Sequence, residues 1–281
     1  METRLSNATK HVIIGQEHPT VLIGERINPT GKKKMAEALR EGNLEVVCQE
    51  AVTQVAAGAD IIDINVNATG IDELTMLPRV VQAVMQIVDT PLCLDSPNPE
   101  ALAAALGVYR GKPLINSVTG ETRSLERVLP LVKEYGAAVI GLPQDDNGVP
   151  TDIEPRLAIA QRIIERAEAL GIPREDIIID CLTFAVGADS RSGLVTLETI
   201  RRVTAELGVN VTLGASNISF GLPDRSLLNH AYVAMAIASG VTCLIVDVAR
   251  VRPMVLATDV LFNRDGYARR YIQAYRQRRS G

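Results

Sequence analysis

Short apolar runs recur along the chain, and segments with helical periodicity separate them. The runs are rich in Val, Ile and Leu and are nearly continuous in hydrophobicity. They cover residues 20–25, 59–65, 90–95, 112–116, 137–142, 176–180, 209–214 and 242–247. Strands that are buried on both faces have this pattern, as in a parallel sheet covered by helices. We therefore expect these eight runs to be parallel strands.

The intervening segments predict helices. Residues 76–88 and 156–171 each place their apolar side chains along one helical face. In the segment SPNPEALAAALG, Asn98 is expected to cap a helix, with Pro99 at its first position and Gly107 at its end. Strands and helices therefore alternate through most of the chain.

The repeat length favours a closed barrel. From Glu25 to Asp247 a new strand begins about every 32 residues, and eight such units with about 250 residues are typical of a (β/α)8 TIM barrel. The alternative is an open doubly wound sheet, but no GxGxxG motif follows a strand. We expect an α/β protein that forms a single domain over residues 1–281. Residues 1–18 would form an N-terminal arm, in which HVIIG is a candidate hairpin strand that closes the bottom of the barrel.

Polar residues stand at the carboxyl ends of seven of the eight runs. They are Glu25, Arg26, Asn28, Asp63, Asn65, Asn67, Asp95, Ser96, Asn116, Ser117, Asp180, Ser216, Asn217 and Asp247. Any one of them is explained equally well as a helix cap or a turn residue. In a barrel, however, these ends converge on the face that carries catalytic residues. Seven such ends in register therefore favour a site over a purely structural role.

The residue types at these ends narrow the chemistry. None is a histidine, and no cysteine nucleophile lies beside a base. An octahedral metal site with oxygen ligands from Asp63, Asp95 and Asp180 is an alternative. A metal site of the Cys/His type is not indicated, because no Cys/His cluster has the spacing of metal ligands. Carboxylates accept from adjacent N–H groups, and amides match donor–acceptor edges. The set therefore favours binding of a flat, polar heterocycle such as a pterin.

Composition and charge indicate the kind of surface and the cellular compartment. The chain is 47% hydrophobic and 22% charged, with a net charge of −4, which gives no indication of a nucleic-acid surface. Its four cysteines are isolated, which favours a reducing compartment, and neither a signal peptide nor a membrane span is evident. We expect a soluble cytoplasmic protein. The basic segment RRYIQAYRQRR is expected to be a solvated last helix, with an acidic partner surface as the alternative.

Six segments in order resemble the methyltetrahydrofolate:corrinoid methyltransferases, a group related to the folate domain of cobalamin-dependent methionine synthase. They are IGERINPTGKKK, GADIIDINVNA, LCLDSPNPEAL, PLINSVTGE, IIIDCL and LGASNISFGLP. The resemblance implies a pterin-binding (β/α)8 barrel, usually a homodimer. It also implies methyl transfer between N5 of tetrahydrofolate and the cobalt of a corrinoid (cobalamin) on a separate protein. No Asp-x-His-x-x-Gly segment for a corrinoid is present in the chain.

The resemblance also assigns site residues. Asp95, Asn116 and Asp180 would hold the pterin, Gly214 and Ser216 would line the same cavity, Asp63 and Asn65 would complete its floor, and Asn217 would lie beside N5 as the catalytic residue. An amide there can strengthen its hydrogen bond as the methyl group leaves, without the desolvation cost of a charged acid.

Three alternatives remain. Dihydropteroate synthases share the pterin barrel, but they carry Asn-Thr-Pro-Asp-Ser-Phe-Ser after strand one and Ser-Arg-Lys at strand seven, where this chain has NPTGKKK and ASNIS. A non-catalytic folate-binding subunit would keep the same scaffold. An unrelated barrel enzyme could act on another flat heterocycle. Within the resemblance, Phe220 replaces a polar residue of some members, and residues 183–193 match no family segment; a plain exposed loop is favoured there over a mobile cover.

Overall fold

Eight parallel strands form one sheet in the order β10-β3-β4-β5-β6-β7-β8-β9. The computed structural model describes residues 1–280, and Gly281, the last residue of the expected domain, lies outside the described residues. The strands are β3 Val21–Ile27, β4 Ile61–Asn65, β5 Leu92–Asp95, β6 Leu114–Thr119, β7 Ala138–Leu142, β8 Ile177–Asp180, β9 Asn210–Thr212 and β10 Cys243–Val246. Each begins one or two residues after its predicted start. The barrel closes where Ile245 N donates to Leu213 O at 3.1 Å, so the prediction of a (β/α)8 barrel is confirmed and the open sheet is excluded.

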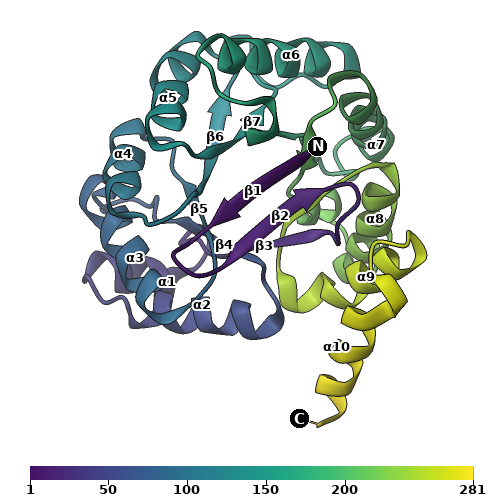
Figure 1. Ribbon diagram of the computed structural model, residues 1–281, viewed down its shortest axis with the longest axis horizontal. Helices are drawn as coiled ribbons and strands as arrows, with labels where there is room; N and C mark the ends of the chain where they lie inside the picture. Colours follow the sequence, from purple (N-terminus) through teal and green to yellow (C-terminus); the bar gives the residue numbers. More distant parts are fainter. Residues whose placement is uncertain (281) are drawn as a thin grey trace.

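Helices surround the barrel, as expected from the apolar stripes (Figure 1). They are α1 Lys33–Arg40, α2 Glu45–Ala57, α3 Glu73–Ile87, α4 Pro99–Val108, α5 Thr122–Tyr135, α6 Ile153–Ala169, α7 Ser192–Arg202, α8 Arg225–Ser239, α9 Val248–Leu261 and α10 Arg269–Ser280. Short helical turns join them at η1 Arg174–Asp176, η2 Val203–Leu207, η3 Ala215–Ser219 and η4 Gly266–Ala268. The basic tail thus forms α10, a helix as expected.

The ends of α4 test the capping predictions. Asn98 accepts hydrogen bonds from Glu100 N and Ala101 N, and Pro99 starts the helix, so both predictions are confirmed. The predicted stop at Gly107 is wrong, because α4 continues to Val108 and leaves through extended Tyr109. The Tyr109 hydroxyl donates to Ser6 O at 2.9 Å and accepts from Leu92 N at 3.2 Å. These tertiary contacts, rather than a left-handed glycine, accompany the end of the helix.

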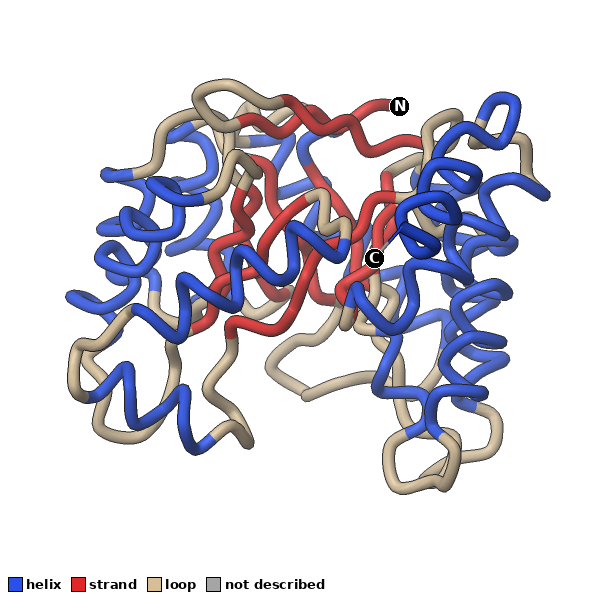
Figure 2. The backbone as a smooth tube through the Cα atoms, turned by 90° about the horizontal axis from the view of Figure 1, so that it is seen from below, coloured by secondary structure: helices blue, strands red, loops and turns tan. Residues whose placement is uncertain are grey.

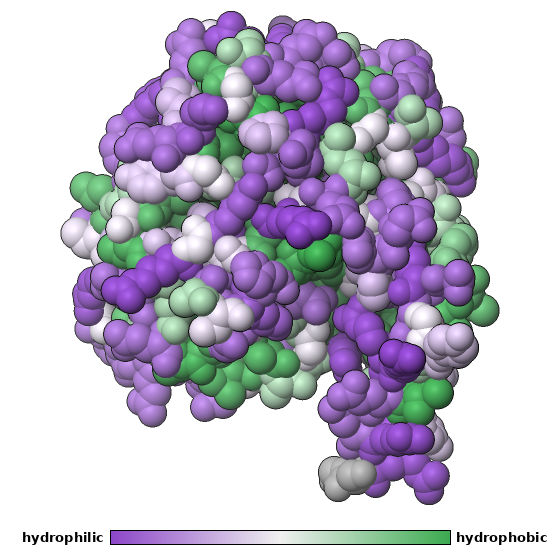
Figure 3. Space-filling view, viewed as in Figure 1, coloured by the Kyte–Doolittle hydropathy of each residue, from purple (hydrophilic) through white to green (hydrophobic). Residues whose placement is uncertain are grey.

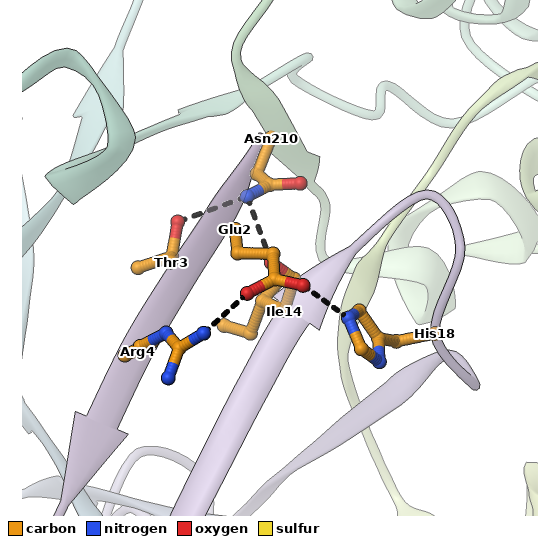
Figure 4. A network of polar contacts seen from close by, with 6 residues as sticks. All are labelled: Glu2, Thr3, Arg4, Ile14, His18 and Asn210. Atoms are coloured by element: carbon orange, nitrogen blue, oxygen red, sulfur yellow. Dashed lines mark hydrogen bonds and ion pairs between the residues drawn. The ribbon is translucent and has the colours of Figure 1, made fainter.

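A hairpin closes one end of the barrel. Strands β1 Glu2–Ser6 and β2 His11–Gly15 pair antiparallel and cross the amino-terminal ends of the barrel strands, opposite the long loops (Figures 1 and 2). Buried Asn210, at the start of β9, donates to Thr3 Oγ1 at 2.9 Å and to Ile14 O at 3.0 Å (Figure 4). Glu2 also pairs with Arg4 and His18. Side-chain bonds therefore fix the hairpin to the barrel.

The hairpin also completes the core inside the barrel. Its inward side chains Leu5, Val12 and Ile14 join interior residues of seven strands in one apolar cluster. A second cluster fills the space between the strands and the helices. The barrel is thus closed at this end by packed side chains, and the opposite end remains available for a site.

Replacing Ile14 with alanine should reduce the free energy of unfolding by about 2–5 kcal/mol, because Ile14 is fully buried and its loss leaves a cavity in the barrel. The exposed neighbour His11 in the same strand provides the control, and His11→Ala should change stability by less than about 0.5 kcal/mol. Urea unfolding measures both. Equal stabilities of the two variants would contradict the packing role of the hairpin.

The surface combines hydrophilic and hydrophobic side chains. The face in Figure 3 is mainly hydrophilic, with scattered hydrophobic areas, and α10 projects from the barrel. Within residues 1–280, no helix combines the length and hydrophobicity that a membrane crossing requires.

Candidate active site

Strand periodicity directs the predicted polar residues into the barrel. Inner-core residues Ile61, Cys93, Leu114 and Ile178 are each followed two positions later by Asp63, Asp95, Asn116 and Asp180. Side chains alternate across a strand, so residues two apart face the same side. The interior therefore changes from apolar to polar toward the loop end, and strand alternation directs all four side chains into the same interior, with Asp63 in register with Cys93 and Asp95 in register with Asn116.

Two amide–carboxylate pairs organise this layer. Asn116 Nδ2 donates to Asp63 Oδ1 at 3.3 Å, and Asn65 Nδ2 donates to Asp95 Oδ2 at 2.9 Å. Asn65 in turn accepts from Asn67 N at 2.8 Å, which fixes the orientation of its amide. Asp63 and Asn65 therefore lie beneath and beside Asn116 and Asp95 and set their orientation.

Burial shifts the ionisation of the carboxyl groups. It raises the pKa of Asp95 and of Asp180 from 3.8 to about 6. Burial, followed by the negative charge of Asp95, raises the pKa of Asp63 well above its usual value. Asp95 and Asp180 are consequently acceptors above about pH 6.

Two adjoining cavities open above this layer and share Asn116 and Leu142 in their walls. The first, the Asp95 cavity, has a volume of about 480 Å³ and includes Asp95, Asn116 and Gln144. The second, the Asn217 cavity, has a volume of about 500 Å³ and includes Asn116, Asp180, Gly214, Asn217 and Phe220. The structure therefore brings together four predicted residues in one cavity and Asp95 in the next.

Ser216 is an exception. We expected it to line the same cavity as Gly214, but its Oγ lies 3.5 Å from Glu25 Oε1 and it lines a third cavity instead. Residues 215–219 form the turn η3, in which successive side chains point about 120° apart. Neighbouring Ser216 and Asn217 therefore face different sides, which corrects the prediction.

Asn217 is held by its backbone and has a free side chain. Its N–H donates to Gly214 O at 3.4 Å, and its carbonyl accepts from Phe220 N at 3.1 Å. Among residues 1–280, its side-chain amide has no hydrogen-bond partner, and it is exposed to the cavity. A Cβ at Gly214 would lie 3.3 Å from Asn217 Nδ2, so a larger residue there would crowd the amide. The backbone therefore fixes the position of Asn217, while its side-chain amide remains free to bind a ligand.

Arg156 on α6 was not foreseen as part of the site. It is 1% exposed and donates at 3.0 Å to the carbonyls of Pro150, Cys181 and Leu182. These bonds shape the turn after β8, in which Leu182 N donates to Asp180 Oδ1 at 2.8 Å. An arginine on the otherwise apolar buried face of α6 was the available signal in the sequence.

Residues 183–193 are more than a plain exposed loop. Thr183 and Ser192 are buried, and Phe184 and Ala185 line the Asn217 cavity. Arg156 lies 5.1 Å from the centre of the Phe184 ring, and Val186 N donates to Ile218 O at 3.0 Å. The first part of this segment therefore forms a wall of the site and contacts η3.

The two cavities offer carboxylates, amides and hydroxyl groups, and Arg123 and Arg127 stand in the wall of the first. Of the described residues, those that line them include no histidine, cysteine or lysine. Carboxylates with a pKa near 6 can accept paired N–H groups, and Asn116, Asn217 and Gln144 can both donate and accept. The arrangement suits recognition of a planar heterocycle that carries N–H groups on its edge.

Comparisons with known proteins identify the family. Residues 24–247 match the family described as pterin binding enzyme. The chain is 31% identical over 271 residues to the methylcorrinoid:tetrahydrofolate methyltransferase of Eubacterium limosum, across 93% of this chain and 98% of that protein. It is 29% identical over 266 residues to the methionine synthase of Mycobacterium leprae, across 90% of this chain but only 22% of that protein.

Solved structures support the same fold. A dihydropteroate synthase of Yersinia pestis with a pterine-sulfa conjugate has a TM-score of 0.71 at 19% identity, across 93% of this chain and 100% of that one. The dihydropteroate synthase of Xanthomonas albilineans has a TM-score of 0.69 at 22% identity, with 93% and 98% covered. At these identities the likeness concerns the fold alone. Since the family match spans most of the barrel and the Eubacterium relative aligns over nearly its whole length, the chain belongs to the pterin binding enzymes, in the group that includes that methyltransferase.

Proposed function

We propose that this chain transfers a methyl group between N5 of tetrahydrofolate and the cobalt of a corrinoid carried by a separate protein. The observation that carries the proposal is the convergence of Asp180, Asn116 and the unpartnered amide of Asn217 on one cavity, with Asp95 in the adjoining one. The 31% identity to a methylcorrinoid:tetrahydrofolate methyltransferase supports it.

The pterin edge explains the ring of acceptors. A pterin presents an exocyclic amine next to a ring N–H, and a carboxylate accepts both. Asp95, Asn116 and Asp180 would hold the ring, while Asp63 and Asn65 keep Asn116 and Asp95 oriented. Asn217 would then lie beside N5. Its amide would accept from N5 as that nitrogen gains a proton, which stabilises the transition state more than the ground state.

The partner supplies the corrinoid, whose cobalt exchanges the methyl group with N5. Asn217 and Phe220 are both exposed, and Phe220 is 68% exposed, so the expected N5 position can be approached from outside the barrel. This chain's own residues would bind the folate and position N5 for that approach. A corrinoid protein is accordingly the partner we propose.

Dihydropteroate synthesis is the alternative that the fold relatives raise. The strand-seven sequence disfavours it: the synthases carry Ser-Arg-Lys there, whereas this chain has ASNIS, and no lysine is among the described residues that line the two cavities. Mixing the protein with methyltetrahydrofolate and reduced cob(I)alamin should produce the methylcobalamin spectrum. Incubation with a dihydropterin diphosphate and p-aminobenzoate should produce no dihydropteroate. The reverse outcome would overturn the proposal.

Folate affinity should depend on pH through the carboxylates. Because burial raises the pKa of Asp180 and Asp95 to about 6, and binding requires their anionic forms, affinity should rise about tenfold per pH unit for each group up to pH 6 and then level off. Calorimetric titration of tetrahydrofolate between pH 5 and 8 measures this, and Asp180→Asn should weaken binding and flatten the profile. A flat wild-type profile would contradict the assignment.

The same ionisations should affect stability with the opposite sign. Their raised pKa values stabilise the fold most below the unfolded value of 3.8, and this contribution is lost as pH rises through about 6. Bound folate should restore stability above pH 6, because it pairs with the ionised groups.

Three further features of the working protein are proposed. We propose that residues 1–281 act as one pterin-binding unit with residues 1–18 as its arm, a view supported by the packing of the hairpin inside the barrel.

We propose a homodimer, supported by exposed apolar residues near the carboxyl terminus such as Leu261 and Tyr267, and sedimentation analysis would test it. We propose a cytoplasmic location, consistent with four cysteines that form no disulfide.

A further inference from the structure

We propose that Ser96 and Glu73 are positioning residues for Asp95: Ser96 holds the turn that carries this carboxylate, and Glu73 anchors Ser96 and places a second carboxyl group nearby. The inference rests on the proposed function, in which Asp95 holds the pterin. Ser96 directly follows Asp95 at the end of β5, and Glu73 is the first residue of α3. Two elements far from each other in the chain thus meet behind one ligand-binding carboxylate.

The Ser96 hydroxyl joins these elements. Its Oγ donates to Glu73 Oε2 at 2.5 Å and accepts from Asn98 N at 3.1 Å. The backbone N–H of Ser96 donates to Asn116 O at 3.1 Å. Ser96 borders the Asp95 cavity but is only 2% exposed, because these protein groups surround it. The residue after Asp95 is therefore tied to α3, to the start of α4 and to β6.

Two prolines make the turn after β5 depend on these bonds. Pro97 and Pro99 stand on either side of Asn98, and neither proline has an N–H to donate. The backbone donors of the turn are therefore those of Ser96 and Asn98, which bond to Asn116 O and to the Ser96 hydroxyl. Removal of that hydroxyl would leave Asn98 N without its acceptor and free the turn to move relative to β5.

Glu73 adds a negative charge near Asp95. Burial is the largest cause that raises the pKa of Asp95 to about 6, the hydrogen bond from Asn65 opposes it, and the charge of Glu73 raises the pKa further. Glu73 is held there by the bond from Ser96 and by its place at the start of a helix, where a negative charge is favourable. Removing this charge should therefore lower the pKa of Asp95 and keep it anionic at lower pH.

Other charged groups also surround Asp95. Asp63 lies on the neighbouring strand β4, and burial and then the negative charge of Asp95 raise the pKa of Asp63. The others, from α4, α5 and the residue before α5, are Glu100, Glu121, Arg123 and Arg127. The test variants leave all of them unchanged, so a difference from the wild type reports on Glu73 or Ser96.

The first test removes the charge of Glu73 and keeps its shape. Glu73→Gln retains an acceptor for the Ser96 hydroxyl, so the turn stays held while the pKa of Asp95 in the ligand-free protein falls below about 6. Carbon-13 NMR titration of the carboxyl groups measures this pKa, with Asp95→Asn to assign the signal. By calorimetry, tetrahydrofolate should bind Glu73→Gln about two- to threefold more tightly than the wild type at pH 5.5, and equally at pH 8, where Asp95 is ionised in both.

Glu45→Gln is the matched control for the charge. Glu45 is likewise the first residue of its helix, α2, but it is exposed and is not among the residues that line the Asp95 cavity. Both variants lose a favourable charge at a helix start, so their midpoints of urea unfolding should fall alike. Only Glu73→Gln should lower the pKa of Asp95. The same Asp95 pKa in Glu73→Gln, Glu45→Gln and the wild type would overturn the role of Glu73.

The second test removes the Ser96 hydroxyl. Because the turn then releases Asp95 but leaves Asn217 in place, Ser96→Ala should raise the dissociation constant for tetrahydrofolate about tenfold at pH 8. Its single-turnover rate at saturating folate should change less than about twofold. Asn98→Ala is the control, since it loses the cap of α4 and a comparable amount of stability but keeps the backbone bond to Ser96. Asn98→Ala should bind tetrahydrofolate like the wild type.

The outcomes separate this inference from the proposed function. If the wild type binds no tetrahydrofolate, the proposed function fails, while the titration of the ligand-free protein still decides whether Glu73 acts on Asp95. If the wild type binds tetrahydrofolate and Ser96→Ala weakens binding no more than Asn98→Ala does, Ser96 supports the fold alone and its positioning role is wrong.

Discussion

Replacing Asn217 with alanine is expected to slow methyl transfer by roughly one hundred- to one thousand-fold, the range seen when a single transition-state hydrogen bond is removed. Folate binding should weaken only about tenfold or less, because Asp95, Asn116 and Asp180 still hold the ring. The unpartnered amide in the structure explains the difference: it is free to strengthen its bond only as charge develops at N5.

Single-turnover mixing of the folate-loaded protein with cob(I)alamin measures the rate. Asn217→Asp serves as a second variant, because it keeps the shape and adds a charge. Ser216→Ala, one residue away but turned to the third cavity beside Glu25, is the control and should retain most of the rate. An Asn217→Ala rate equal to that of Ser216→Ala would remove Asn217 from the mechanism.

Replacing Arg156 with methionine should have the second large effect. It leaves the carbonyls of Pro150, Cys181 and Leu182 without their donor in a buried position, so the free energy of unfolding should fall by about 3–5 kcal/mol. It also removes the positive charge that lowers the pKa of Asp180 against the larger effect of burial. The pKa of Asp180 should therefore rise above about 6.

Lysine at the same position separates the two roles. Arg156→Lys keeps the charge but lacks the fork that reaches several carbonyls, so it should lose stability while its pH profile for folate binding stays close to that of the wild type. In Arg156→Met the pH at which affinity levels off should move upward. An identical profile in both variants would show that Arg156 supports the fold without tuning Asp180.

The alternation of strand residues explains why so much of the site was predictable. Once the runs at 59–65, 90–95, 112–116 and 176–180 are strands, their last polar residues share a side with Ile61, Cys93, Leu114 and Ile178, and a closed barrel has only one interior. Local pattern and global fold agree at these positions. Asn98 was equally predictable, because a helix cap is determined by adjacent residues.

The features of the site and fold that the sequence did not predict depend on local turn geometry or on contacts between distant segments of the chain. Ser216 turned away because residues 215–219 form a tight helical turn, which a run of small residues does not specify. The helix α4 passes Gly107 and ends beside Tyr109, whose hydroxyl bonds to Ser6, about a hundred residues away. The role of Arg156 depends on a turn that follows a different strand. Such long-range pairings are not visible in hydrophobic periodicity.

A crystal structure of the protein soaked with tetrahydrofolate tests the central claim most directly. The account predicts that the pteridine lies against Asp95, Asn116 and Asp180, with N5 within hydrogen-bonding distance of the Asn217 amide. A pteridine bound elsewhere, or bound with N5 turned away from Asn217, would contradict it.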